Sequence, residues 1–339
     1  MTGGACTNGP GPGPGPGLGL GLDAGGTQTR WGLADAGGTL LAEGAVAGLS
    51  ALQLRSEAGR AAMAQTLGDA ALAVQAAHTA CSAHASPSGA AGGSARLQAV
   101  VAGVTGFGSE DSAALQAHIA MAFDVAAAAV RPMSDIELAC HAAFPAGDGI
   151  VVYAGTGSIA ACLDADGTMH RAGGRGAVID DAGGGHWIAR EAICRVWRAE
   201  DADPGAWRTS PLARHLFAAV GGSDWAATRA WVSGATRGEV GQLALAVAAA
   251  AHQDADAQAL ALLQQAGQEL ARLGLAMRQR LGPLPLALAG RVFDLHPAVE
   301  AALHAALPAG TPARRITLNA HHTAARLAAG AAPAGSACP

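Results

Sequence analysis

Short apolar runs separated by glycine turns dominate the beginning of the chain. Residues 18–23, 27–34 and 39–47 each have an alternating apolar pattern, which predicts three strands joined by tight turns. Farther along, the pattern predicts alternating helices and strands over residues 57–78, 97–104, 111–123 and 125–130, with a further helix that begins at Asp135. The order βββαβα predicts an α/β fold.

The second half of the chain repeats this beginning. From Gly149 the sequence again contains an apolar strand, a glycine-threonine loop, a second strand and an Asp-Gly turn. Two such hairpins, one at the start of each half, are what a duplicated domain predicts. The remainder is mainly helical, with helices expected over residues 211–220, 225–236, 239–281 with interruptions, 297–307 and 320–329, and strands over 284–289 and 314–318.

Length and composition limit the classes of function. A chain of 339 residues is long enough for two domains, each with a full core. Residues 1–16 form a Gly-Pro tract that predicts a disordered leader and does not resemble a secretory signal. No apolar run is long enough for a membrane span. A cytoplasmic protein without a membrane partner is the expectation.

Charge and cysteine usage exclude further classes. The net charge is −5, and all 21 positive side chains are arginine, so a P-loop with its lysine is ruled out. No basic run appears, which argues against a nucleic-acid partner. The cysteines lack a C-x-x-C pair, which predicts reduced thiols rather than disulfides or a structural zinc site; they are Cys6, Cys81, Cys140, Cys162, Cys194 and Cys338.

Two glycine-rich loops are candidate phosphate sites. Gly25, Gly26 and Thr27 expose backbone N–H groups without bulky side chains, and such nests bind phosphate oxygens. Asp23, just before this loop, is placed to hold Mg²⁺ through water.

In the second half Gly155, Thr156, Gly157 and Ser158 form a loop of the same kind. If the two halves face each other, the loops would hold the phosphates of one ATP from both sides. Either loop alone also fits an ordinary hairpin turn.

Asp135 follows a predicted strand and would cap the next helix, which puts its carboxylate at the same end of the sheet as the first loop. A catalytic role and a purely structural capping role both fit this position.

Four segments carry a resemblance to a known family: "DAGGTQTRW", "SDIELA", "AGTGS" and "GGRGAVIDDAGGGHWIARE". Their order and spacing resemble the N-acetylglucosamine kinase group of the BadF/BadG/BcrA/BcrD ATPase family, in the actin-like (sugar kinase/Hsp70/actin) superfamily. The resemblance implies two actin-like, ribonuclease H-like domains with a nucleotide cleft between them. It implies a first domain over residues 17–145, completed by a C-terminal helix over 319–331, and a second domain over 146–318.

The resemblance also implies roles for individual residues. Asp135 occupies the place of the catalytic aspartate, and the two loops contact ATP phosphates. Gly174, Arg175 and Asp181 match the sugar-binding block, and Gly290 matches the adenosine-side segment. ATP and Mg²⁺ are the implied cofactors, a small sugar is the implied substrate, and a homodimer stays open.

Some positions depart from the family pattern. Leu52 lies in a segment where the sugar kinases carry an asparagine, Arg175 stands in place of a common tryptophan, and Ala182 in place of an acid. These departures leave open which sugar is bound. The ROK group of sugar kinases is disfavoured because its zinc-binding cysteine cluster is absent.

An amino-sugar kinase acting on the 6-hydroxyl of N-acetylglucosamine or glucosamine is the favoured function. Two alternatives remain. One is an ATPase that activates a radical dehydratase or reductase, in which Cys140 resembles a cluster ligand but no second cysteine is present in the glycine loop. The other is a sugar-sensing ATP-binding protein without turnover.

Overall fold

The computed structural model describes residues 17–84 and 96–330, so the Gly-Pro leader at residues 1–16 lies outside the described residues. The described chain divides into two compact units. Unit 1 contains residues up to Leu138 together with the segment that begins at Asn319, and unit 2 contains the residues from Ala139 to Leu318. The division falls inside a helix, earlier in the chain than the expected boundary at residues 145–146. Within the described residues, no helix combines the length and apolar character that a bilayer span requires.

The sheet of unit 1 has the strand order β3-β2-β1-β4-β5. The first three strands are antiparallel, whereas β4 and β5 extend the sheet in parallel from β1. The strands are β1 (Leu18–Ala24), β2 (Gln28–Ala34), β3 (Leu40–Ala47), β4 (Leu97–Val104) and β5 (Val130–Ser134). The three predicted hairpin strands and the strand over 97–104 are therefore confirmed.

The strand predicted over residues 125–130 is wrong. Ala127–Ala129 form a 3₁₀ turn, and the strand begins only at Val130. A run of alanines has little preference for a pleated sheet, whereas the strand that does form contains Pro132. Proline is tolerated there because β5 is an edge strand that pairs with β4 alone.

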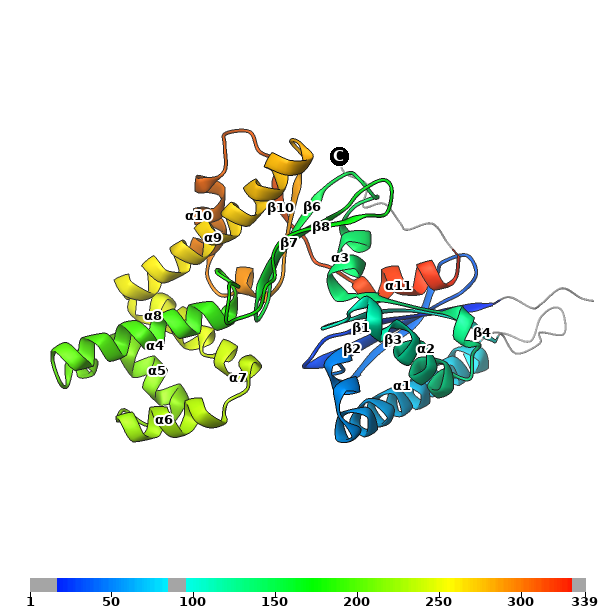
Figure 1. Ribbon diagram of the computed structural model, residues 1–339, viewed down its shortest axis with the longest axis horizontal. Helices are drawn as coiled ribbons and strands as arrows, with labels where there is room; N and C mark the ends of the chain where they lie inside the picture. Colours follow the sequence, from blue (N-terminus) through cyan, green and yellow to red (C-terminus); the bar gives the residue numbers. More distant parts are fainter. Residues whose placement is uncertain (1–16, 85–95, 331–339) are drawn as a thin grey trace, which may run out of the picture. The chain divides into compact units, whose positions relative to one another are not determined.

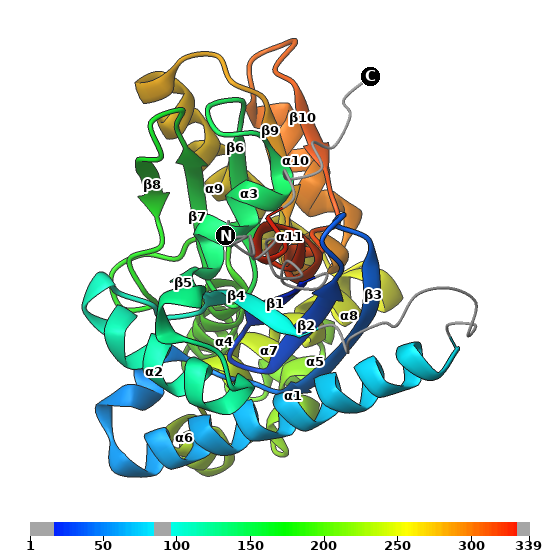
Figure 2. The same cartoon turned by 90° about the vertical axis from the view of Figure 1, so that its right-hand side faces the viewer.

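Helices cover both faces of this sheet, as Figure 1 and Figure 2 show. The leucines of β1 pack with α1 (Glu57–His84) and α2 (Ser112–Phe123) in one core. The opposite face carries α3 (Asp135–Ala143) and α11 (Ala320–Ala328). A Cβ at Gly19 or Gly21 would overlap backbone atoms of the α11 segment. The alternation of leucine and glycine in β1 therefore lets a helix lie directly on one face while the other face contributes large side chains to the core.

The sheet of unit 2 has the order β10-β9-β6-β7-β8, which is the same topology as in unit 1. Three antiparallel strands are again extended by two parallel ones. The strands are β6 (Ile150–Ala154), β7 (Ser158–Leu163), β8 (Met169–Gly173), β9 (Leu286–Ala289) and β10 (Ala313–Arg315). The equal topology supports the predicted duplication, although β10 is shorter than the strand predicted over 314–318.

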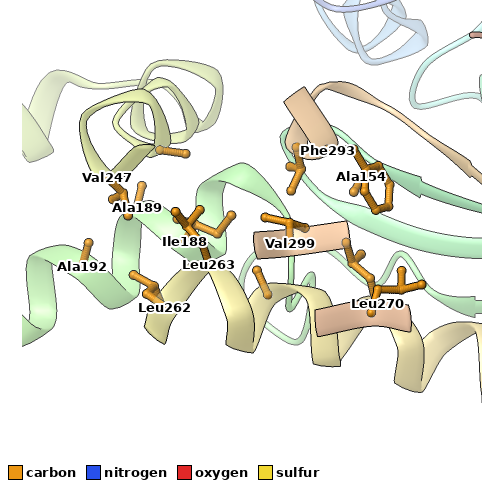
Figure 3. Packing of buried hydrophobic residues seen from close by; sticks show 14 of the residues in the cluster. Ala154, Ile188, Ala189, Ala192, Val247, Leu262, Leu263, Leu270, Phe293 and Val299 are labelled. Carbon is orange, nitrogen blue, oxygen red and sulfur yellow. The ribbon is translucent and has the colours of Figure 1, made fainter. Parts of the chain in front are cut away.

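Helices fill the rest of unit 2. They are α4 (Gly185–Ala202), α5 (Pro211–Val220), α6 (Trp225–Gly234), α7 (Arg237–Gln242), α8 (Ala244–Asp254), α9 (Ala257–Leu281) and α10 (Pro297–Ala306). Figure 3 shows how Ile188 of α4, Leu263 of α9 and Val299 of α10 meet in the core beside the sheet. The expected interruptions of the stretch over 239–281 are real. Asp256 caps α9, since its Oδ1 accepts hydrogen bonds from the amides of Gln258 and Ala259, both at 2.9 Å.

Candidate functional site

The first glycine loop joins β1 to β2 in unit 1. Gly25 N donates a hydrogen bond to Gln28 O at 3.0 Å, and Leu49 N donates to Gly25 O at 3.1 Å. Gly26 and Thr27 are exposed, and their amides have no acceptor among the described residues. The loop therefore presents two free N–H groups and a hydroxyl on a fixed backbone, which is the arrangement of an anion-binding nest.

Asp23 lies in β1 just before this loop, opposite Arg30 of β2. Burial and, to a smaller extent, the negative charge of Asp135 raise the pKa of Asp23 to about 6, although Arg30 opposes this shift. Asp23 and Asp135 lie at the same edge of the sheet. They do so because β1, β4 and β5 are parallel, so their carboxyl ends meet at one edge of the sheet.

Asp135 is the first residue of α3. Its Oδ1 accepts from Ile136 N at 2.9 Å, while Ser134 Oγ accepts from Glu137 N at 3.2 Å. The bond to the third amide, typical of a helix cap, thus comes from Ser134. The other oxygen of Asp135, Oδ2, has no hydrogen-bond partner in the described part of the chain, and so is available to a ligand.

The second glycine loop joins β6 to β7 in unit 2 and is fixed to the glycine run that begins α4. Gly185 N donates to Gly155 O at 2.8 Å, and His186 N donates to Thr156 O at 2.9 Å. A Cβ at Gly184 would lie 2.7 Å from Gly157 Cα, so this approach requires glycine.

Two amides of this second loop are free. Those of Thr156 and Gly157 have no acceptor among the described residues. The Ser158 hydroxyl, in contrast, is used inside the protein, since it donates to Ala182 O at 2.7 Å. The second loop therefore offers backbone donors like the first.

Asp181 lies directly against the second loop. Its side chain is 3% exposed, its Oδ1 accepts from Gly176 N at 3.3 Å, and its Oδ2 pairs with Arg237 of α7. A Cβ at Gly157 would lie 2.6 Å from Asp181 Oδ2. Burial raises the pKa of Asp181, while the charge of Arg237 opposes that shift.

The backbone of Asp181 is unusual as well, with φ at 144°. A non-glycine residue in this region costs about 1–3 kcal/mol and is concentrated at functional sites. The strain, the burial and the ion pair together single out Asp181 in unit 2.

Arg237 was not among the predicted site residues. Its side chain is half exposed, and it places a positive charge beside a phosphate-type loop in a chain that has no lysine. The sequence signal near it is the capping box of Thr236 and Glu239, which puts Arg237 in the first turn of a helix. The capping box does not predict the ion pair with Asp181, which lies 56 residues earlier in the sequence.

The remaining predicted residues lie around the second loop or on the surface. Gly174, with φ at 65°, and Arg175 are exposed and follow β8. Gly290, with φ at 104°, follows β9, and a Cβ there would lie 2.7 Å from the carbonyl carbon of Ala154, the residue before the second loop. Leu52 is 50% exposed in a 3₁₀ turn of unit 1.

Each unit thus gathers its own set of predicted residues. In unit 1 the structure brings together Asp23, the first loop and Asp135. In unit 2 it brings together the second loop, Asp181 and Gly290, and adds Arg237. A cavity of about 70 Å³ beside Asp181 is lined by Ala177, Ile179, Asp180, Asp181, His186, Trp187 and Arg190. Cys140, the candidate cluster ligand, is only 5% exposed.

Comparison with known proteins identifies the family. The sequence model of the BadF/BadG/BcrA/BcrD ATPase family matches residues 20–314, a span that contains both glycine loops, Asp135 and Asp181. The chain belongs to this family. Membership in the BadF/BadG/BcrA/BcrD ATPase family confirms the resemblance inferred from the motifs, and the fold is that of the two-domain actin-like kinases.

Solved structures extend the comparison. A candidate N-acetylglucosamine kinase from Chromobacterium violaceum is 28% identical to this family member, with a TM-score of 0.68, and the match covers 92% of this chain and 98% of that one. Another, from Porphyromonas gingivalis, is 16% identical with a TM-score of 0.63, covering 89% and 95%. A ROK hexokinase from Thermus thermophilus shares the fold at 18% identity, with a TM-score of 0.54 and coverage of 92% and 98%. No curated protein matches the chain.

Proposed function

We propose that this member of the BadF/BadG/BcrA/BcrD ATPase family is an ATP-dependent amino-sugar kinase that phosphorylates the 6-hydroxyl of N-acetylglucosamine or glucosamine. The observation that carries the proposal is the pair of glycine loops with free amides, each beside an acidic residue in an unusual environment. The similarity to the candidate N-acetylglucosamine kinase over 92% of the chain supports the substrate class.

In this proposal the two loops bind the phosphates of ATP. Gly26, Thr27, Thr156 and Gly157 donate their free amides to phosphate oxygens, and Gly290 lies against the adenosine. Asp23 would hold Mg²⁺ through water, because Mg²⁺ prefers oxygen ligands and the Asp23 carboxylate is ionised above about pH 6. When bound, the ion supplies neutralisation of phosphate charge. Arg237 adds a fixed positive charge at the second loop.

Asp135 is the proposed general base. Its free Oδ2 accepts the proton of the sugar hydroxyl. At the same time the hydroxyl oxygen attacks the γ-phosphorus of ATP, and the bond between that phosphorus and the oxygen of the departing ADP breaks. Since phosphoryl transfer needs little covalent chemistry from the protein, positioning and charge neutralisation carry most of the catalysis.

Asp181, with Gly174 and Arg175, is proposed to bind the sugar. Both oxygens of Asp181 already have protein partners, yet a carboxylate oxygen accepts more than one hydrogen bond, so sugar hydroxyls can share them. The burial of Asp181 makes such bonds strong, because little water competes. Arg237 keeps the carboxylate charged and oriented.

The function is tested by measuring ADP release with a panel of sugars: N-acetylglucosamine, glucosamine, N-acetylmannosamine, N-acetylmuramic acid and glucose. Amino-sugar-dependent ADP release, with sugar 6-phosphate detected by mass spectrometry, is the expected result. ATP hydrolysis that is the same with and without every sugar would contradict the kinase proposal and favour an ATPase role.

Asp181→Asn should raise the KM for sugar about tenfold or more and leave the affinity for ATP within a few-fold. The change removes the charge but keeps the size, and a hydrogen bond to a charged group is worth about 1.5–3 kcal/mol. Steady-state kinetics and nucleotide calorimetry measure the two effects. Asp180→Asn is the matched control, since Asp180 binds the amides of Asp181 and Ala182 and faces Arg272. Weaker ATP binding with an unchanged KM for sugar would contradict the sugar-binding role and show that Asp181 supports the second glycine loop.

Thr27→Val and Thr156→Val should each weaken ATP binding modestly without unfolding the protein. Each change removes one hydroxyl while the backbone amides of the loop remain, and a neutral hydrogen bond contributes about 0.5–1.5 kcal/mol. Isothermal calorimetry with a non-hydrolysable ATP analogue should therefore show a Kd about 2- to 12-fold higher. Unchanged affinity in both variants would speak against the two-loop proposal.

A further inference from the structure

Two histidines and a glutamate converge on unit 1 outside the proposed ATP and sugar residues. Glu43 belongs to β3, and His321 and His322 lie in the first turn of α11. Glu43 Oε2 lies 3.1 Å from His321 Nε2 and 2.5 Å from His322 Nε2. The two imidazole rings meet edge to face with centroids 4.1 Å apart. One ligand atom from each residue lies within 4.8 Å of the other two.

Glycines in the sheet permit this convergence. Gly32 is the cross-strand partner of Glu43, and a Cβ there would lie 3.2 Å from His321 O. A Cβ at Gly21 would overlap the same oxygen. Because both positions lack side chains, the first turn of α11 rests directly on the sheet, and the histidines are held beside Glu43 by backbone contacts rather than by flexible side chains.

Exposure differs across the three side chains. His321 is 6% exposed, His322 is 20% exposed and Glu43 is 57% exposed. An ion held by them would thus be covered by protein on the His321 side and open to water on the Glu43 side. Two imidazoles, a carboxylate and one open position form a ligand set that zinc accepts.

We propose that Glu43, His321 and His322 bind a divalent first-row transition metal ion, with Zn²⁺ as the ion of choice. Imidazole nitrogen with carboxylate oxygen suits Zn²⁺, whereas Mg²⁺ prefers all-oxygen ligands, so this site is chemically distinct from the proposed Mg²⁺ position at Asp23. No covalent or redox step is involved.

The pKa shifts of His321 and Glu43 are compatible with this role. Burial lowers the pKa of His321, which favours the neutral imidazole that binds metals. In the metal-free protein, hydrogen bonds from His322 and His321 lower the pKa of Glu43, so its carboxylate is already ionised before a bound ion would displace these hydrogen bonds. Arg30 also contributes positive charge near His321 and opposes a cation, so the charge of Glu43 should decide whether the ion binds.

The surroundings of His321 Nδ1 limit the affinity of the site for Zn²⁺. With Nε2 on the metal, the proton of His321 must sit on Nδ1, which is buried and lacks a hydrogen-bond partner in the described residues. Metal-bound histidines usually donate this proton to a partner, and losing such a partner costs about 10- to 100-fold in affinity. The site should therefore bind Zn²⁺ more weakly than a site with a complete outer shell.

A bound ion would join segments that are 278 residues apart in the sequence. The chain passes from unit 2 to unit 1 between Leu318 and Asn319, immediately before these histidines. The metal would therefore anchor the returning segment to edge strand β3 at the place where it enters unit 1.

The test is Zn²⁺ titration of the untagged full chain by calorimetry, with thermal melting in parallel. One equivalent should bind, and saturation should raise the melting temperature by about 5 °C or more when zinc is near 100 times its Kd. Glu43→Gln and His322→Gln should each weaken binding at least about 100-fold, because losing a ligand costs more than losing an outer partner. His215→Gln is the matched control, since His215 pairs with Asp254 at 2.8 Å on unit 2.

Wild-type affinity in both variants, or no saturable zinc binding by the wild-type chain, would overturn the proposal. Co²⁺ substitution separates this site from the cysteines, because thiolate ligands give a sulfur-to-cobalt charge-transfer band that nitrogen and oxygen ligands do not. Such a band on the bound equivalent would also overturn it. Glu43 is more than half exposed, so Glu43→Gln should fold even if a histidine variant does not.

Discussion

Asp135→Asn should lower kcat with the best amino sugar by about 10²- to 10⁴-fold, the usual contribution of a general base. The substitution keeps the shape of the side chain and the oxygen that accepts from Ile136 N, but it removes the group that takes the hydroxyl proton. ATP affinity should stay near that of the wild type, because the proposed nucleotide contacts come from the two loops.

The structure makes this a test of catalysis rather than of folding. Ser134 already provides the bond to Glu137 N, so α3 should keep its cap and the melting temperature should not fall. Asp224→Asn is the matched control, because Asp224 caps α6 through a 2.8 Å bond to Ala227 N. Single-turnover kinetics and nucleotide calorimetry would measure the two effects. A variant that keeps more than about a tenth of the wild-type kcat would show that Asp135 is not the base.

Asp23→Asn should stabilise unit 1 at alkaline pH by up to about 3 kcal/mol while abolishing efficient turnover. Burial and the charge of Asp135 raise the pKa of Asp23 from 3.8 in the unfolded chain to about 6. Each pKa unit corresponds to about 1.4 kcal/mol, so holding this carboxylate in its charged form costs about 3 kcal/mol. An amide imitates the neutral acid and avoids that cost, but it is a poor partner for hydrated Mg²⁺.

The sign of the pH dependence follows from proton binding. Below about pH 4 Asp23 is protonated in both the folded and the unfolded chain, so it makes no difference to stability. Between about pH 4 and pH 6 the folded state retains a proton that the unfolded state has lost, so stability falls as pH rises. Above about pH 6 Asp23 is charged in both states, and the folded state bears the full cost of holding the buried carboxylate in its charged form. The gain from Asp23→Asn should therefore be largest near pH 8 and vanish near pH 4.

Urea unfolding of both proteins across this pH range measures the gain. Because Asp135 contributes to the raised pKa of Asp23, the gain at alkaline pH should be smaller in an Asp135→Asn background. A gain that is independent of pH would contradict the assigned cause. Retention of wild-type kcat and Mg²⁺ dependence by Asp23→Asn would contradict the proposed role in catalysis.

The hairpin strands of both units, their turns and the family can be predicted from the order of residues alone. Strong alternation in β1 and β2, glycines at the hairpin turns, and the repetition of this pattern after Gly149 are local signals that need no tertiary information. The position of Asp135 after a strand is predictable as well, although the strand runs over Val130–Ser134 and not over the predicted residues 125–130. The alanines at 126–129 have no clear preference, and only the edge position of β5 explains why a segment with Pro132 becomes the strand.

Which side chains meet cannot be predicted from the order of residues, because the partners are far apart in the chain. Asp181 and Arg237 are 56 residues apart, and Glu43 and His321 are 278 apart, so no periodic pattern connects either pair. The backbone approach that permits both contacts depends on glycines whose missing side chains leave room for another segment, at Gly157 in unit 2 and at Gly21 and Gly32 in unit 1. In the sequence these glycines look like any others, because the atoms that would collide with a side chain belong to distant parts of the chain.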